Sequence, residues 1–403
     1  MLKVSIFTPS HDPKYLFSLY QSIKDQGFYE WVILLNNTSW DIPTEIREDF
    51  RVKIHKTPST GDSYVGTLKR LCCEECKGDI LLEVDHDDLL VDGAIQEVSK
   101  AFENNPDVGF VYSNTVNFRD QFQKSERFAE GHGWEYKPFK YKSYQLEEFK
   151  AFPPTPESVS RIWYAPNHLR AWRKDIYDQV GGHANMRVLD DLELMCRTYL
   201  VTKFHHIDRA LYLYRIDGGN TWLKYNEEIQ NNVYRIYDEY IERMILRLDG
   251  RKIDLGARFG KTFEYESVDL KNADINCDLN QKWPFEDNSV AVIRATDIFE
   301  HLQDPIHTLK ECYRVLKPGG WIIGQVPSTD GRGAYQDPTH RSFWNENSFL
   351  YYTDQNWSRW IDTPVRFQAI RLFTTEKDAN QVCWVKFHLL KLADNRPPGL
   401  IHI

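Results

Sequence analysis

The sequence lacks any long uninterrupted run of apolar residues. Nowhere in its 403 residues does an apolar stretch approach the roughly 18–20 positions that a membrane-spanning helix needs. Residues 1–9 are too short and too interrupted for a signal peptide and fit a first β-strand better. We therefore expect neither a transmembrane segment nor a leader.

Cysteine is also scarce. The seven cysteines are odd in number and thinly spread, which excludes a small disulfide-stapled scaffold. Cys72, Cys73 and Cys76 form one Cys-x2-Cys without a second pair nearby, so buried thiols on a helix face are favoured over zinc. Reduced thiols and the lack of a signal peptide together predict a cytoplasmic protein.

Basic residues are too few for a nucleic-acid protein. Fifty Lys and Arg face 59 Asp and Glu, giving a net charge of −9. Duplex binding normally requires a basic footprint, and an acidic surface is repelled by anionic lipid. We expect no nucleic-acid partner. The oligomeric state is not indicated by the sequence.

What is present is an ordinary globular composition, with 41% hydrophobic and 27% charged residues and no internal repeat. The first half alternates short apolar runs with helical patterns, which predicts an α/β domain with a largely parallel sheet. Strands are expected at 3–8, 31–35, 52–55, 80–84 and 108–112, and helices at about 15–25, 63–76 and 93–104. Ligands bind at the carboxyl ends of such strands, so residues 9–11, 36–37 and 85–88 should surround one crevice.

The alternation fails over residues 119–166, an aromatic- and lysine-rich excursion. Residues 222–248 then have apolar positions three or four apart, which predicts one long helix. A second α/β pattern starts at Arg251. We therefore expect a domain over 1–221, a linking helix over 222–250 and a smaller domain over 251–403.

Acidic residues gather at two places in the first domain. Asp85, Asp87 and Asp88 follow the run 80–84, and such oxygen-only ligands suit Mg²⁺ or Mn²⁺, which would bridge a diphosphate. The alternative is a solvated acidic turn that caps the next helix. Asp190 and Asp191 either stabilise a helix dipole or supply a general base that faces the first cluster.

The order of these features resembles that of the GT-A-fold, family-two, inverting glycosyltransferases. The resemblance covers about residues 1–225. Its motifs are Phe7-Thr8-Pro9-Ser10-His11, Ser22-Ile23 with Gln26, Gly61 and Gly66 with Lys69 and Arg70, Asp85-His86-Asp87-Asp88, Gly181-Gly182-His183, Asp190-Asp191-Leu192-Glu193, and Tyr214-Arg215-Ile216-Asp217. The chain departs from the family at Asn36-Asn37-Thr38-Ser39, where an acidic turn is usual, and at Asp217, where a histidine is usual.

The resemblance implies a nucleotide-diphospho-sugar transferase fold and single displacement with a divalent cation, Mn²⁺ or Mg²⁺, held by Asp87 and Asp85. It implies a nucleoside-diphosphate sugar as donor and a glycan or lipid-linked acceptor. Asp191, with Asp190, becomes the catalytic base. The donor-binding residues would be Pro9, Ser10, His11, Asn36, Asn37, Lys69, Asp85 and Asp87. Trp163, Tyr164, His168 and Trp172 form either an acceptor platform or core packing.

The second half resembles class I S-adenosylmethionine-dependent methyltransferases over about residues 251–352. The motifs are Pro284-Phe285-x-Asp287-x-Ser289, Glu300-His301-Leu302 and Arg314-Val315-Leu316-Lys317-Pro318-Gly319-Gly320. Residues 337–343 resemble a branch found in polysaccharide and sugar-modifying pathways. The resemblance implies a Rossmann-like fold with S-adenosylmethionine as cofactor. The implied methyl-donor-binding residues are Gly256, Gly260, Asp269, Asp278 and Asp297.

His301 is a candidate base for methyl transfer, or else a helix-capping or packing residue. Two departures bear on the cofactor. Ala257-Arg258 replace the usual small residues, and only 13 positions separate Gly256 from Asp269, which leaves little room for the first helix. The domain therefore either binds the cofactor or is a degenerate module that packs, recruits or dimerises.

Three functions are compatible with these features. The leading one is a glycosyltransferase fused to a domain that O-methylates the sugar. The second is a methyltransferase whose N-terminal domain positions a glycan. The third is a glycan- or nucleotide-binding scaffold without catalysis. The retained Asp85, Asp87 and Asp191 weigh against the third, because a decaying site would have no reason to keep them.

Overall fold

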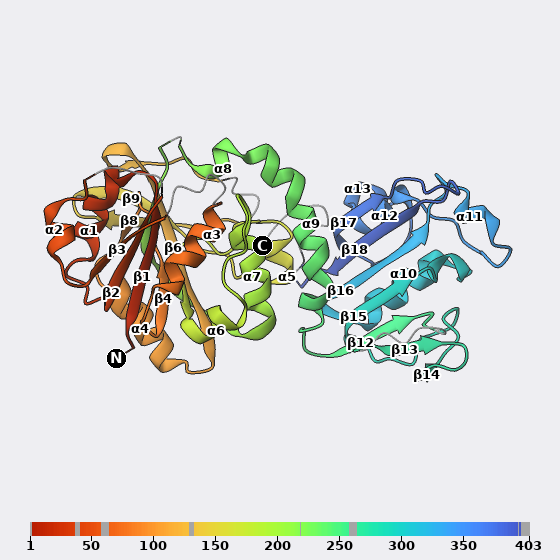
Figure 1. Cartoon of the computed structure of the whole chain (residues 1–403). Helices are drawn as coiled ribbons and strands as arrows, with labels where there is room; N and C mark the ends of the chain where they lie inside the picture. Colours follow the sequence, from red (N-terminus) through yellow and green to blue (C-terminus); the bar gives the residue numbers. More distant parts are fainter. Residues whose placement is uncertain are drawn as a thin grey trace. The chain divides into compact units, whose positions relative to one another are not determined.

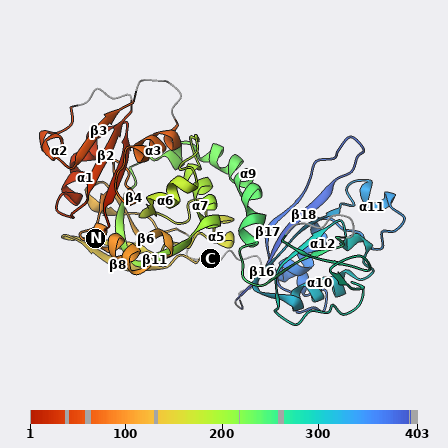
Figure 2. The ribbon, with the colours of Figure 1, turned by 60° about the horizontal axis from the view of Figure 1, so that its bottom comes forward.

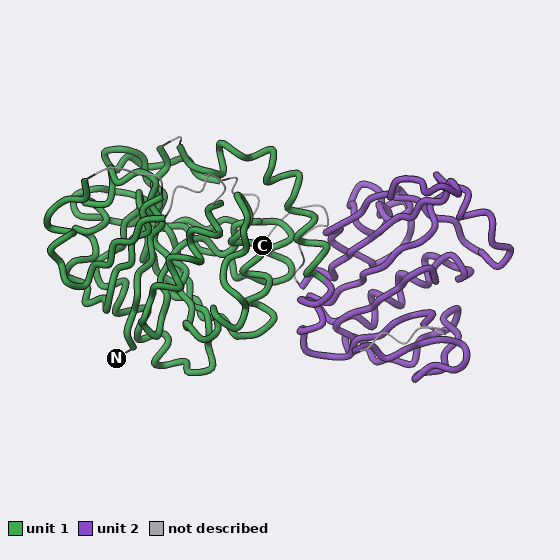
Figure 3. The backbone as a smooth tube through the Cα atoms, viewed as in Figure 1, with its two compact units in different colours: residues 1–241, 403 green, residues 242–402 purple. Residues whose placement is uncertain are grey.

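The computed structural model describes residues 2–36, 41–57, 64–128, 133–217, 219–257, 264–393 and 395. The chain divides into two compact units, unit 1 (residues 1–241 and 403) and unit 2 (residues 242–402), which Figure 3 colours separately. Both are mixed α/β, so the predicted fold class is confirmed. The predicted long helix is two helices, α8 (Thr221–Lys224) and α9 (Asn226–Ile245), and the division between the units falls within α9.

The main sheet of unit 1 has a parallel half and a mixed half (Figure 1). Its strand order is β3 (Val52–Lys56), β2 (Glu30–Leu35), β1 (Val4–Ser10), β4 (Ile80–Glu83), β10 (Arg170–Arg173), β6 (Val108–Arg119), β11 (Lys203–Arg215), β5 (Leu89–Leu90). The first four strands are parallel, and β10 runs antiparallel between β4 and β6. The carboxyl ends of β1, β2 and β4 therefore meet at one edge, as the sequence predicts.

Three helices of unit 1 lie close to their predicted places, namely α1 (Leu16–Ile23), α3 (Val65–Glu74) and α4 (Ala94–Asn104). Further helices are α2 (Thr44–Glu48), α5 (Pro156–Val159), α6 (Lys174–Gln179) and α7 (Asp190–Val201), with the 3-10 turns η1 (Pro13–Tyr15) and η2 (Asp120–Phe122). The excursion 119–166 contains a hairpin of β8 (Tyr136–Tyr141) and β9 (Tyr144–Phe149), and β7 (Gln123–Lys124) pairs with β6. The strand expected at 108–112 continues to Arg119 because β11, far along the chain, pairs with it throughout.

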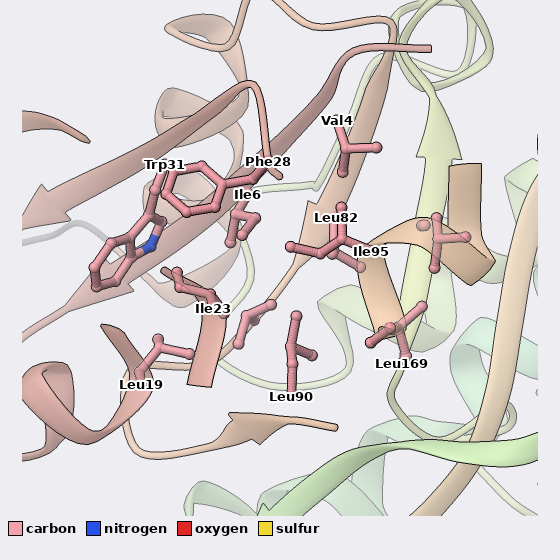
Figure 4. Close-up of a cluster of buried hydrophobic side chains, with 14 of the residues drawn as sticks. Val4, Ile6, Leu19, Ile23, Phe28, Trp31, Leu82, Leu90, Ile95 and Leu169 are labelled. Carbon is pink, nitrogen blue, oxygen red and sulfur yellow. The ribbon is translucent and has the colours of Figure 1, made fainter. Parts of the chain in front are cut away.

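Side chains of the β1–β4 strands alternate between two packed faces. On one face Ile6 and Trp31 pack against α1 and α4, and Figure 4 shows this cluster. On the other face Phe7 and Leu34 pack against α3 and α7. Figures 1 and 2 show α1 and α3 on opposite sides of these strands. Cys72, Cys73 and Cys76 are free and buried in the second cluster, which confirms the prediction of buried thiols.

Unit 2 contains a seven-stranded sheet. Its order is β14 (Ile275–Asn276), β13 (Glu266–Asp269), β12 (Arg251–Leu255), β15 (Val290–Thr296), β16 (Leu316–Pro327), β18 (Trp384–Lys391), β17 (Phe367–Thr374), with β18 antiparallel to both of its neighbours. Its helices are α10 (Pro305–Val315), α11 (Gly333–Gln336), α12 (Glu346–Thr353) and α13 (Gln355–Ser358), with the 3-10 turn η4 (Phe299–His301). Strand order reverses at β12, which marks the ligand crevice of such sheets.

Two further findings concern helices. In the part of the β12–β13 connection that the structure describes, residues 256–257 and 264–265, there is no helix, in line with the short spacing in the sequence. Within the described residues, every helix is too short or too polar to cross a membrane.

We predict that Trp31→Ala lowers the free energy of unfolding of unit 1 by about 3–5 kcal/mol. Trp31 is fully buried, stacks on Tyr20 and donates its indole N–H to Thr8 Oγ1 at 2.9 Å. The matched control is Phe50→Ala, because Phe50 is 84% exposed and its removal should change stability by less than about 0.5 kcal/mol. Calorimetry of the two variants would measure both values, and equal effects would contradict the assigned core.

Candidate functional site

A cavity of about 680 Å³ opens in unit 1, at the edge where β1, β2 and β4 end. The predicted residues that line it are Pro9, Ser10, His11, Asn36, Lys69, Asp85, Asp87, Asp190 and Asp191. Asn37 lies outside the described residues. The structure thus brings together residues from five separate segments that the sequence singled out.

The three acids after β4 differ in burial and in their contacts. Asp88 is 1% exposed and accepts hydrogen bonds from the Tyr212 hydroxyl (2.8 Å) and the Arg215 backbone N–H (2.7 Å). Asp85 and Asp87 are half-buried and line the cavity. Helix α4 starts at Gly93 without any side-chain cap, so the alternative role of these acids as a helix cap is not supported.

The electrostatics of this wall favour a cation. Burial raises the pKa of Asp87, and the neighbouring carboxylates of Asp85 and Asp217 raise it further. Asp217, which replaces the family's histidine, also lines the cavity. These residues offer carboxylate oxygens, the donors that Mg²⁺ and Mn²⁺ prefer, so the residues present fit a divalent ion.

Another wall of the cavity carries the second acidic pair, at the start of α7. Asp190 is 4% exposed, with Oδ2 3.6 Å from Lys69 Nζ, and burial raises its pKa to about 6 even though Lys69 opposes the shift. Asp191 is half-buried. Burial would raise its pKa, but Arg170, whose Nη1 lies 3.0 Å from Asp191 Oδ2, and Lys69 together lower it. The pKa values of the two neighbouring acids are therefore shifted in opposite directions.

Two charged residues that hold this wall were not predicted. Glu83 lies fully buried in β4, inside the run that we took as apolar, with Oε1 2.6 Å from Lys69 Nζ. Arg170 is 2% exposed in β10 and lies 3.9 Å from Glu83 as well as beside Asp191. A single acid within a buried strand was the available signal for Glu83. No local pattern marks Arg170. Lys69, predicted to bind the donor, is engaged by Glu83 and Asp190.

The aromatic platform is only partly assembled. Trp163, Tyr164 and His168 line the cavity. Trp172 is 1% exposed and packs against Phe110 instead, so for this residue the core-packing alternative holds. Trp172 lies in β10, two residues after Arg170, and belongs to the sheet core.

In unit 2, the predicted methyl-donor residues lie at the carboxyl ends of strands. Gly256 follows β12 with φ +75°, and a Cβ there would come within 2.8 Å of Ile298, so this turn requires glycine. Asp269 ends β13 and Asp297 follows β15. Asp278 is exposed and accepts from the Asn280 backbone N–H at 2.9 Å. A glycine turn with an acid at the end of the next strand fits an adenosyl cofactor. Gly260 and Arg258 lie outside the described residues.

His301 ends η4, and its Nδ1 lies 3.1 Å from Thr339 Oγ1. The following helix α10 is capped by Asp304, whose side chain accepts from two backbone N–H groups. His301 therefore does not cap that helix.

Comparison with known proteins assigns both units. A glycosyl transferase family 2 model matches residues 5–159, and a methyltransferase domain model matches residues 252–324. A probable S-adenosylmethionine-dependent methyltransferase of Mycolicibacterium smegmatis is 31% identical over 80 residues, which is 19% of this chain and 29% of that protein. An uncharacterized methyltransferase of Schizosaccharomyces pombe is 44% identical over 41 residues, 10% of this chain and 15% of that protein. The chain thus spans less than a third of these curated relatives.

Solved structures of S. aureus TarS, residues 1–349, are also similar. The complex with UDP-GlcNAc has 16% identity and a TM-score of 0.46, covering 62% of this chain and 68% of that chain. Another structure of the same fragment has 15% identity and a TM-score of 0.43, covering 62% of this chain and 66% of that chain, just under two thirds. The two family matches, rather than these structures, confirm both predicted resemblances. The chain joins a glycosyl transferase family 2 domain to a methyltransferase domain.

Proposed function

We propose that unit 1 transfers a sugar, with inversion, from a nucleoside-diphosphate sugar to a hydroxyl group of a glycan or lipid-linked acceptor. The observation that carries this proposal is that one cavity has two acidic walls of different character. Asp85 and Asp87 form one wall, and Asp191 belongs to the other. A donor with a charged leaving group and an acceptor with a proton to lose need these two kinds of carboxylate.

The first wall suits the leaving group. Asp87 and Asp85 would hold a divalent cation, Mn²⁺ or Mg²⁺, which when bound offsets the charge that develops on the diphosphate. Pro9, Ser10, His11 and Asn36 line the adjoining part of the cavity and would contact the nucleotide. Asn36 Oδ1 already accepts from Thr57 Oγ1 at 3.0 Å, which fixes its amide orientation.

The second wall suits proton removal. Asp191 is kept ionised by Arg170 and oriented by the Leu192 backbone N–H, which donates to Asp191 Oδ1 at 2.8 Å. As the acceptor oxygen bonds to the anomeric carbon and the bond to the diphosphate breaks, the hydroxyl proton passes to Asp191. Asp190, buried against Lys69, positions the start of α7 rather than contacting the acceptor.

We predict that Asp87→Asn lowers kcat/KM for sugar transfer by about 100-fold or more, because several kcal/mol of charge stabilisation are lost. It should also abolish the metal-dependent thermal shift that the correct nucleotide, drawn from UDP, GDP, TDP and CMP, gives with Mn²⁺. The control is Asp92→Asn, an exposed carboxylate five positions on that does not line the cavity.

The outcomes separate the three hypotheses. Nucleotide binding without transfer, unaffected by Asp87→Asn, would favour the scaffold. Absence of any nucleotide shift, with a shift from S-adenosylhomocysteine, would favour a methyltransferase with a positioning domain.

The two acids of α7 can be told apart by pH. With Asp191 as base, kcat/KM at saturating Mn²⁺ should stay constant from pH 7 to about pH 5, because its pKa is lowered from that of an ordinary aspartate and its active form is the carboxylate. With Asp190 as base, activity would already decline as the pH falls through about 6. A pH–rate profile measured where circular dichroism shows intact fold decides between them.

We further propose that unit 2 binds S-adenosylmethionine and methylates a sugar hydroxyl, with the glycine turn and Asp269 as supporting observations. The role of His301 as the base for methyl transfer stays a prediction from the sequence. The cytoplasmic location expected from the free thiols also stays a prediction.

We predict that S-adenosylhomocysteine raises the melting temperature of unit 2 and that Asp269→Ala weakens its affinity by at least about 10-fold, since an acid at this position binds both ribose hydroxyls. Asp362→Ala, at an exposed acid elsewhere in unit 2, should leave the shift unchanged. An undiminished rise in melting temperature in Asp269→Ala would contradict the assigned cofactor site.

A further inference from the structure

Three metal-ligating side chains converge in unit 2 beside the predicted cofactor crevice. Glu300, His301 and His340 each offer one ligand atom, and these atoms all lie within 4.8 Å of one another. Glu300 and His301 belong to η4, and His340 lies in the segment 337–343 that the sequence analysis singled out. Two imidazoles and a carboxylate are a common ligand set for divalent transition metals.

The carboxylate of the cluster is buried without compensation. Glu300 is 2% exposed, and its Oε2 finds no hydrogen-bond partner within the described part of the chain. Leaving a buried carboxylate oxygen unpaired costs free energy, which a coordinated cation would recover.

Hydrogen bonds select the same tautomer in both imidazoles. His340 Nδ1 lies 2.9 Å from the Ala334 carbonyl, which only accepts, so Nδ1 carries the hydrogen. Thr339 donates its hydroxyl hydrogen to Asp337 at 2.7 Å and therefore accepts from His301 Nδ1. Each ring keeps a free lone pair on Nε2. Metal-binding histidines typically donate their other N–H in this way, to a carbonyl or to a group backed by a carboxylate.

Hydrogen bonds to backbone carbonyls join η4, which carries Glu300 and His301, to the segment that carries His340. The Glu300 carbonyl accepts from the backbone N–H groups of Arg341 (2.7 Å) and Ser342 (3.0 Å), and the Ser342 hydroxyl donates to the Phe299 carbonyl at 2.9 Å. The residues next to His340 are thus fixed to η4 in the absence of a metal. The site is organised by the fold and not by the ion.

The side chains around the cluster are acidic, which favours a bound cation. Asp297 and Asp337 both interact electrostatically with His301 and His340. With Glu300, they place three acidic side chains around the two imidazoles.

We propose that Glu300, His301 and His340 bind one divalent transition-metal ion of the Zn²⁺ class. Both histidines are half-buried, so one side of the ion stays open to an oxygen ligand. Use of that open position by a sugar hydroxyl rests on the methyl transfer proposed above, whereas metal binding itself does not. A base role for His301 alone would not explain why Glu300 and His340 each place a ligand atom within 4.8 Å of it.

The test is direct Zn²⁺ binding to the full chain in an Asp85→Asn/Asp87→Asn background, which removes the predicted cation site of unit 1. Isothermal titration should give one Zn²⁺ per chain. Co²⁺ substitution should give visible d–d absorption typical of nitrogen and oxygen ligands. S-Adenosylhomocysteine binding, measured in parallel, reports separately on the proposed methyltransferase function.

His340→Ala and Glu300→Gln should weaken Zn²⁺ binding by more than 10-fold. Thr339→Val, which removes the partner of His301 Nδ1 and its hydroxyl bond to Asp337, should weaken it by about 10-fold. His307→Gln, at a histidine of unit 2 outside the cluster, should leave the affinity unchanged. Melting curves without metal identify any variant that fails to fold, and Thr339→Val is the least disruptive of the set. Absence of Zn²⁺ binding in the parent, or equal affinity in the parent and in folded His340→Ala, would overturn the proposal.

Discussion

Glu83 is a carboxylate buried within strand β4, and the cavity of unit 1 depends on how its charge is balanced. Lys69 from α3 lies 2.6 Å away and Arg170 from β10 lies 3.9 Å away. Each cation continues to one acid of α7, Lys69 to Asp190 and Arg170 to Asp191. Removing one partner from such a network typically costs about 3–5 kcal/mol. The ion pairs therefore fix the start of α7 relative to the sheet.

The same charge balance gives the two acids of α7 opposite pKa shifts. Two cations serve three carboxylates, so one carboxylate is poorly compensated, and this is the deeply buried Asp190. Asp191 keeps its charge because Arg170 faces it. Neighbouring groups whose environments push their pKa values apart are a recurrent sign of an acid–base site. In unit 2, by contrast, no hydrogen-bond donor in the described region meets Glu300 Oε2, and burial raises the pKa of Glu300 to about 8, so its carboxylate form needs an added cation for compensation.

Local patterns were sufficient for the strands and for the acids at their ends. The apolar run before Asp85 predicts a buried strand, and the turn that follows must lie at the carboxyl edge of the sheet. Arg170 could not be placed in this way, because its position follows from β10 running antiparallel between β4 and β6, pairings that join residues far apart in sequence. For the same reason the sequence marked both His301 and the segment of His340 but not their approach across 39 positions.

The loop that carries Asp85 and Asp87 is completed by residues synthesised much later. Asp88 is held by Tyr212 and by the backbone of Arg215, 127 positions downstream, and the Asp85 backbone N–H donates to the Tyr212 hydroxyl. At about 5–20 residues per second on the ribosome, roughly 6–25 s pass before these partners exist. A nascent chain that ends before β11 can therefore form β1 to β4 but not the acidic loop in its final shape. Interrupted translation would release a fragment in which the loop with Asp85 and Asp87 lacks these partners.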